Sequence, residues 1–258
     1  MARLNQTSRN RDADSAPVRT IKPQQAAAQN GLRSAVKVSG LALLGALLAG
    51  CLVYSPALSG PFVFDDFVLP FRLPDFRGET LREWMASVRP LLMLSYWFNY
   101  QWSGRESTFS YHLLTVLIHS VNTVLVGAVL WRILQWTNAR RGRRQLLTAV
   151  GAGAFLLHPL QSESVAYIAG RSESLSALWC LAAWATMLYR PTDVLSWRRV
   201  LAILLFFGAA LATKEHTVAL AGVLLLTDAF AAGTSFLAAV RRNWRLYAPL
   251  AAGAVVGG

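Results

Sequence analysis

Two adjacent aspartates, Asp65 and Asp66, stand in the apolar and aromatic stretch PFVFDDFVLP, residues 61–70. Partial burial by neighbouring phenylalanines would raise their pKa values toward the range in which a carboxylate serves as a general base. One interpretation is therefore a general base whose neighbour positions substrate or a metal ion. The other is a turn aspartate or a helix N-cap, and both stay open on the residues alone.

A second polar stretch, HPLQSESVAYIAGRSES, covers residues 158–174. Glu163, Tyr167 and Arg171 are four residues apart, a spacing that predicts one shared helix face. Such a face can bind anions and hydroxyl groups at a membrane surface. It can equally be a structural cap with an ion pair.

A third polar group, TKEH, interrupts the apolar residues 200–230 with Lys214 and Glu215. A lysine near the headgroup boundary can bind a lipid phosphate as a point charge. An internal ion pair or simple snorkelling from a turn is the alternative.

The histidines and cysteines give little support for metal chemistry. His112 and His119 are seven residues apart and share a helix face, which favours packing over a metal pair. Cys51 and Cys180 fall in apolar runs and are expected to be buried thiols. No CxxC, HExxH or P-loop pattern occurs, so no metal site is assigned, and a divalent metal ion is left open.

The composition predicts an all-α integral membrane protein. The chain is 54% hydrophobic and only 15% charged, whereas soluble domains carry about 25% charged residues. The net charge of +12 comes from arginines that lie between apolar blocks, which indicates membrane topology. No basic segment is interleaved with stacking aromatics, so nucleic-acid binding is not expected.

The apolar blocks predict about seven spans after a disordered cytoplasmic tail, residues 1–37, and a long outer loop, residues 57–111. The transmembrane domain is expected over 38–258 and to be incomplete, since the chain ends in an apolar run. The spans are predicted at about 38–56, 112–136, 146–160 and 175–189, as two short spans within 200–230, and from 246 onward.

Arginine clusters should face the cytoplasm, which puts the other charged residues at the outer face. Those residues are Asp65, Asp66, His158, Glu163, Arg171, Glu173, Lys214 and Glu215. In the outer loop, Leu81, Trp84 and Leu92 recur at helical spacing, so an amphipathic helix that Pro90 breaks or kinks is predicted. The aromatic residues 91–102 are expected to lie on the membrane.

Five stretches occur in one order: PFVFDDFVLP, RPLLMLSYWFNY, YHLLTVLIHSVNTVLV, FLLHPLQSESVAYIAGRSESLSAL and ALATKEHTVALAGVLLLTDAF. Over about 54–230 this ordered set resembles the membrane half of the transmembrane, tetratricopeptide-containing O-mannosyltransferases. Those proteins have the class C glycosyltransferase fold. No 34-residue helical repeat is visible here, although the family usually carries such repeats.

The resemblance implies an inverting glycosyltransferase. It would move mannose or another hexose from a polyprenyl- or dolichyl-phosphate carrier to a protein hydroxyl on the non-cytoplasmic side. Asp65 and Asp66 match the catalytic acids of the first outer loop, with Asp65 preferred as the base. The cations Arg89, Arg171 and Lys214 are expected to hold the carrier phosphate.

His158, Glu163 and Glu215 also match motif positions of the family, and we expect substrate or structural roles for them and for Glu173. The bacterial inner membrane is the expected location, with the endoplasmic reticulum membrane as the alternative. The competing functions are a membrane transporter and a non-catalytic membrane scaffold. A transporter predicts charges near mid-membrane, whereas the charges here are expected at one face.

Overall fold

The computed structural model describes residues 40–74, 76, 78 and 80–257, which are helical wherever they are regular. The predicted tail, 1–37, lies outside them. The first helix is Gly40–Val53. The connection to the next long helix contains α2 (Ser55–Leu58), η1 (Phe64–Val68), η2 (Pro70–Arg72), α3 (Leu81–Met85) and α4 (Pro90–Ser103).

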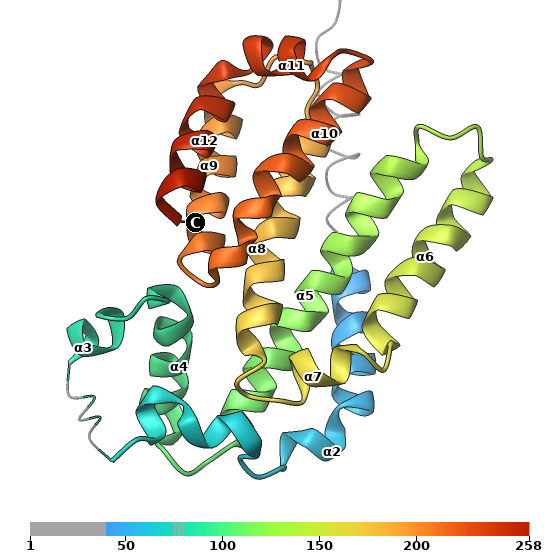
Figure 1. Cartoon of the computed structure of the whole chain (residues 1–258). Helices are drawn as coiled ribbons and strands as arrows, with labels where there is room; N and C mark the ends of the chain where they lie inside the picture. The colour runs from blue at the N-terminus through green and yellow to red at the C-terminus, as the bar shows by residue number, and fades with distance from the viewer. Residues whose placement is uncertain (1–39, 75, 77, 79, 258) are drawn as a thin grey trace, which may run out of the picture. The chain divides into compact units, whose positions relative to one another are not determined.

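The long helices follow this connection and pack side by side (Figure 1). They are α5 (Phe109–Leu134), α6 (Arg141–Leu157), α8 (Arg171–Leu188), α9 (Trp197–Leu211), α10 (Leu220–Ala232) and α12 (Trp244–Gly257). Shorter elements join them: α7 (Gln161–Val165), η3 (Glu215–Ala219) and α11 (Phe236–Arg242).

Two described helices are long and apolar enough to cross a membrane, Phe109–Leu134 and Glu215–Ala232. The latter joins η3 to α10 without a break. The helix Gly40–Val53 is apolar but shorter. The remaining long helices occupy the segments expected to span, and the number of seven crossings stays a prediction.

Helix α5 is the central packing element, with α6 and α8 against it. Its hydroxyl side chains bond back to its own backbone: Thr115, Ser120 and Thr123 each donate to the carbonyl four residues earlier. Small side chains satisfied in this way allow neighbouring helices to approach closely in a membrane.

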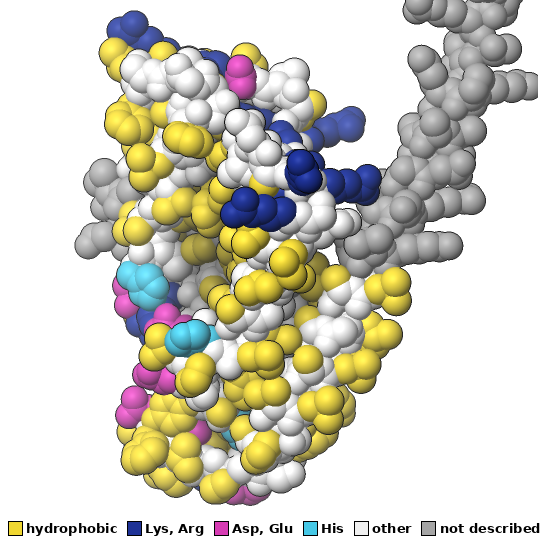
Figure 2. Space-filling view, turned by 90° about the vertical axis from the view of Figure 1, so that its right-hand side faces the viewer, with side chains coloured by type: hydrophobic (Ala, Val, Ile, Leu, Met, Phe, Trp, Pro, Cys, Tyr) yellow, Lys and Arg dark blue, Asp and Glu magenta, His cyan; other side chains and the backbone are white. Residues whose placement is uncertain are grey.

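The two ends of the helices differ in charge. Among the described residues, most arginines lie in the loops and helix ends between α5 and α6, between α8 and α9, and around α11, and we call this the arginine end. The opposite end, which carries η1, α7 and the α9–η3 turn, is called the acidic end (Figure 1). In Figure 2, Lys and Arg gather in the upper part of the visible face, and most Asp, Glu and His lie below. The assignment of either end to a membrane side remains a prediction.

Of the two alternatives for Pro90, the structure shows a break, and the expected place of residues 91–102 on the membrane stays a prediction. Pro90 begins α4, because proline suits the first helical position, where no N–H is needed. Leu81 and Leu92 therefore lie on different helices. Within α4, Tyr96 is fully buried together with Trp84 of α3, so residues 91–102 pack into the protein interior as well as facing outward.

The expected helix through Glu163, Tyr167 and Arg171 is also wrong. Helix α7 ends at Val165 and α8 begins at Arg171, with Gly170 as its N-cap. A Cβ atom at Gly170 would lie 2.3 Å from the Glu163 carbonyl oxygen, so the chain folds back here only because glycine has no side chain.

The substitution Gly170→Ala should therefore destabilise the protein by about 1–3 kcal/mol, since backbone must move to admit the methyl group. Thermal unfolding in detergent measures the loss. Gly153→Ala in α6 is the matched control: nothing lies within 4 Å of its Cβ position, and it should stabilise by about 0.5–1 kcal/mol. Equal melting temperatures for the two variants would contradict the close approach at Gly170.

Candidate functional site

Three segments that are distant in sequence meet at the acidic end. The η1 segment contacts the α7–α8 connection, because Ala169 N–H donates to Asp66 Oδ1 at 2.7 Å. The start of α4 contacts the α9–η3 turn, because Leu91 N–H donates to the Ala212 carbonyl at 3.2 Å. Lys214 of that turn pairs with Glu173 of α8.

Asp66 is a structural residue. It is completely buried, and its second oxygen accepts from Val63 N–H at 3.2 Å, so both carboxylate oxygens hold backbone N–H groups. Asp66 occupies the third position of η1 and satisfies an N–H at the start of that element. Of the two interpretations of the aspartates, the structural one, in which the carboxylate caps a turn or helix start, describes Asp66.

Asp65 is exposed, and its carboxylate makes no hydrogen bond or ion pair within the described part of the chain. Its backbone N–H donates to Tyr167 Oη at 2.6 Å, which fixes the backbone and leaves the carboxylate available. The preceding Phe64 has φ +47°, a strained value for a residue with a side chain. Phe64 and Phe67 are largely exposed and do not shield Asp65 as expected.

Arg171 is completely buried at the start of α8 and is saturated by partners on α4 and α5. Its nitrogens donate to Asn99 Oδ1 at 2.7 Å, the Tyr111 carbonyl at 2.7 Å and Thr115 Oγ1 at 3.2 Å. Its guanidinium carbon lies 4.6 Å from the ring centroid of Tyr96. Such a cation joins three helices, and its burial is incompatible with the phosphate-binding role expected for it.

Arg89 and Lys214 lie nearer the surface, and each is paired with a carboxylate. Arg89 donates to both oxygens of Glu215, at 2.6 and 3.1 Å, and both side chains are about half exposed. Lys214 pairs with Glu173, whose other oxygen lies 4.0 Å from His216 Nε2. Burial is the main cause that lowers the pKa of Lys214. These cations are held in place, and the carboxylates that hold them remain partly exposed.

The remaining expected residues have different surroundings. His158 ends α6 and accepts from Leu160 N–H through Nδ1 at 3.2 Å, which makes it a turn residue. Glu163 is exposed at α7, and its carboxylate has no hydrogen bond or ion pair among the described residues. It is near enough to Lys214 to favour the charged amine.

A cavity of about 470 Å³ opens beside these ion pairs, between α5, α6, α7, α8 and α10. Its polar lining includes Gln161, Ser164, Glu173 and His216, and its apolar lining includes Phe155, Cys180, Leu181, Trp184, Leu220 and Val223. His119 and Asn122 of α5 line it as buried polar groups. Sequence reasoning missed Asn122, although an amide inside an apolar span is a functional signal in itself.

The described residues contain no group of three His, Cys, Asp or Glu side chains that could hold a metal ion. His119 Nε2 lies 3.2 Å from the Leu156 carbonyl, and its ring packs against Tyr54 and Phe155. His112 is buried too, and neither of its nitrogens has a partner in the described part of the chain. Cys51 and Cys180 are free thiols.

The different surroundings of the two aspartates predict different effects on stability. Asp66→Asn should lower the free energy of unfolding by about 1–3 kcal/mol, because one buried backbone N–H loses its acceptor. Asp65→Asn should leave the melting temperature unchanged, because its carboxylate has no partner. Thermal unfolding of both variants checks this. A stability loss confined to Asp65→Asn would reverse the assignment.

Comparison with known proteins identifies relatives of one kind. The chain is 30% identical over 215 residues to protein O-mannosyl-transferase TMTC1 of Mus musculus, covering 72% of this chain and 22% of that protein. It is 32% identical over 151 residues to TMTC4 of Homo sapiens, covering 50% and 20%. It is 31% identical over 179 residues to Tmtc3 of Drosophila melanogaster, covering 61% and 19%.

The chain thus spans about a fifth of the length of each of these relatives. No family model matches, and no solved structure matches. Each of these three relatives is called a protein O-mannosyl-transferase, and each matches half or more of this chain. The comparisons therefore confirm the resemblance of this chain to the TMTC protein O-mannosyl-transferases.

Proposed function

We propose that the protein is an inverting glycosyltransferase of the membrane. It transfers a hexose, with mannose the first candidate, from a polyprenyl- or dolichyl-phosphate carrier to a hydroxyl group of a protein on the non-cytoplasmic side. The names of the relatives support the sugar and the protein acceptor. The lipid carrier, the membrane side and the class C fold rest on the sequence resemblance and on the arguments below.

One observation carries the proposal: the outer loop and the cationic turn are fixed to the same few residues of the chain. Asp66 is bonded to Ala169, and Lys214 pairs with Glu173. Ala169 lies just before Gly170, the N-cap of α8, and Glu173 lies in the first turn of that helix, so the two attachment points are only four residues apart along the chain. A free carboxylate beside Asp66 and a cation beside Glu173 can therefore face one headgroup.

The cavity beside the ion pairs supports a lipid-borne donor. Its polar lining includes Glu173 and His216, and its wall between α6, α8 and α10 is largely apolar. An isoprenoid chain can lie along such a wall, while its phosphate stays at the charged rim. The donor then reaches the site from within the membrane plane.

The proposed reaction assigns separate tasks to the exposed groups. The acceptor oxygen attacks the anomeric carbon from the face opposite the phosphate, and Asp65 takes the hydroxyl proton. The bond between the anomeric carbon and the phosphate oxygen breaks, and its electron pair remains on the phosphate. Lys214 and Arg89 stabilise that charge after exchanging Glu173 and Glu215 for phosphate oxygens.

Arg171 and Asp66 do not touch substrate in this proposal. Arg171 positions α4 against α5 and α8, and Asp66 fixes the loop that carries Asp65. Glu163, exposed near Lys214, is available for contact with the sugar.

Replacement of Asp65 tests the reaction. Asp65→Asn should lower the rate of hexose transfer to an acceptor peptide by roughly 10²–10⁴-fold, the usual contribution of a general base. The measurement uses labelled polyprenyl-phosphate hexose and the whole protein in vesicles. Glu106→Gln, a carboxylate of the same loop that pairs with Arg72, is the control and should retain activity. Transfer at the wild-type rate by Asp65→Asn would refute the assignment.

Replacement of Lys214 tests the phosphate contact. Lys214→Ala should raise the KM for the lipid donor by about tenfold, the effect of one charged contact, and leave the KM for the acceptor unchanged. Arg198→Ala removes an exposed cation from the arginine end and serves as the matched control. An equal change in both KM values, or none, would contradict a contact between Lys214 and phosphate.

A further inference from the structure

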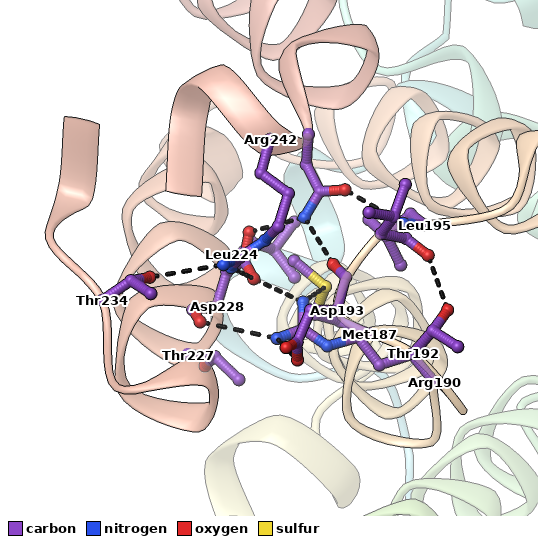
Figure 3. Close-up of polar contacts among 12 residues, drawn as sticks. Met187, Arg190, Thr192, Asp193, Leu195, Leu224, Thr227, Asp228, Thr234 and Arg242 are labelled. Atoms are coloured by element: carbon purple, nitrogen blue, oxygen red, sulfur yellow. Dashed lines mark hydrogen bonds and ion pairs between the residues drawn. The ribbon is translucent and has the colours of Figure 1, made fainter. Parts of the chain in front are cut away.

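A second charged centre lies at the arginine end, far along the helices from the candidate site. Asp228 of α10 is completely buried and accepts four hydrogen bonds (Figure 3). Arg190 and Arg242 donate to one of its oxygens at 2.5 and 2.7 Å, and Asn243 and Tyr247 donate to the other, both at 2.9 Å. Two arginines thus share this carboxylate, and Arg190 also lies 3.8 Å from Asp193.

A polar pocket of about 140 Å³ adjoins this cluster, between the end of α5, the α8–α9 loop and α10. Arg190 lines it and is only 8% exposed, and Arg132 of α5 lines it from the opposite side. Arg132 donates through Nε to the Leu188 carbonyl at 2.9 Å and through Nη1 to Gln135 at 2.6 Å. Its Nη2 donates to no described residue, so one charged donor is unused.

The pocket borders an exposed apolar track. Leu226 and Phe230 of α10 are four residues apart on one helix face and are 58% and 73% exposed. The Phe230 ring packs 5.5 Å from Trp136, which also lines the pocket. An aromatic pair at the junction of a charged pocket and an apolar helix face is typical of the level where a lipid headgroup meets its chains.

We infer that this pocket binds the phosphate of an anionic membrane lipid, with Arg132 and Arg190 as the cationic contacts and the acyl chains along Leu226 and Phe230. Basic pockets between helices at one membrane surface recognise phosphate headgroups. The site lies outside the sugar-transfer machinery and does not depend on the proposed reaction. A soluble phosphate offers the same oxygens, and the experiment distinguishes the two sources.

Asp193 allows a second prediction, in which a substitution strengthens binding. Its carboxylate lines the pocket, is 62% exposed and lies 3.8 Å from Arg190 Nη2. It competes with an incoming phosphate for that arginine. Removal of its charge should therefore strengthen binding, a gain that a misfolded variant cannot produce.

The test measures binding of dioleoylphosphatidylglycerol to the detergent-purified protein by native mass spectrometry. Arg132→Gln should weaken binding about fivefold, the effect of one arginine near a charged headgroup, and Arg132→Lys should retain most of it. Asp193→Asn should strengthen binding by about two- to fivefold. Arg143→Gln, an exposed arginine of the same end, should stay within about twofold of the wild type.

A parallel titration uses inorganic phosphate. Binding of phosphatidylglycerol without binding of inorganic phosphate supports a lipid site. If only inorganic phosphate binds, with the same dependence on Arg132 and Asp193, the pocket is a site for soluble phosphate and the lipid assignment is wrong. Equal losses in Arg132→Gln and Arg143→Gln would show diffuse surface attraction and overturn the inference. So would wild-type affinity in both Arg132→Gln and Asp193→Asn.

Discussion

The fold of the acidic end depends on one buried cation. Arg171 has no exposed surface. Neutral acceptors and aromatic faces of α4 and α5 stabilise its charge, and no described carboxylate is hydrogen-bonded to it. A buried guanidinium is tolerated only when its donors are satisfied, so α4, α5 and α8 must keep their relative positions. The connection that precedes Arg171 also holds the outer loop in place, because Ala169 N–H donates to Asp66. The positions of the exposed groups follow from this arrangement.

A division between structural and exposed charges follows from that constraint. Asp66 and Arg171 are buried and hydrogen-bonded inside the protein, whereas Asp65 and Glu163 have carboxylates without a hydrogen bond or ion pair among the described residues at the same end. Arg89 and Lys214 are intermediate, because their carboxylate partners are partly exposed and can be exchanged for another anion. At the arginine end a carboxylate, Asp228, holds Arg190, which unlike Arg171 also lines a pocket.

Hydropathy and charge could predict the helical segments, the break near Lys214 and the two charged ends, because these depend on local composition. They could not predict that α7 and α8 are separate helices, since this depends on the contact of Gly170 with the Glu163 carbonyl. The adjacent aspartates show the same limit for the site. Two identical residues in one motif have opposite burial, which is decided by Ala169, a residue 103 positions after Asp66. The partners of Lys214 and Arg89 are also distant in sequence, at 41 and 126 residues.

The central claim is that Asp65, Arg89 and Lys214 face one lipid-borne sugar phosphate. The most direct measurement is an experimental structure of the whole protein in a lipid nanodisc, bound to a polyprenyl-phosphonate analogue that cannot transfer its hexose. The account predicts phosphonate oxygens within about 4 Å of Lys214 Nζ and the Arg89 guanidinium, the distance of an ion pair. It also predicts the Asp65 carboxylate on the opposite face of the sugar. A headgroup bound away from both cations, or Asp65 turned away from the sugar, would contradict it.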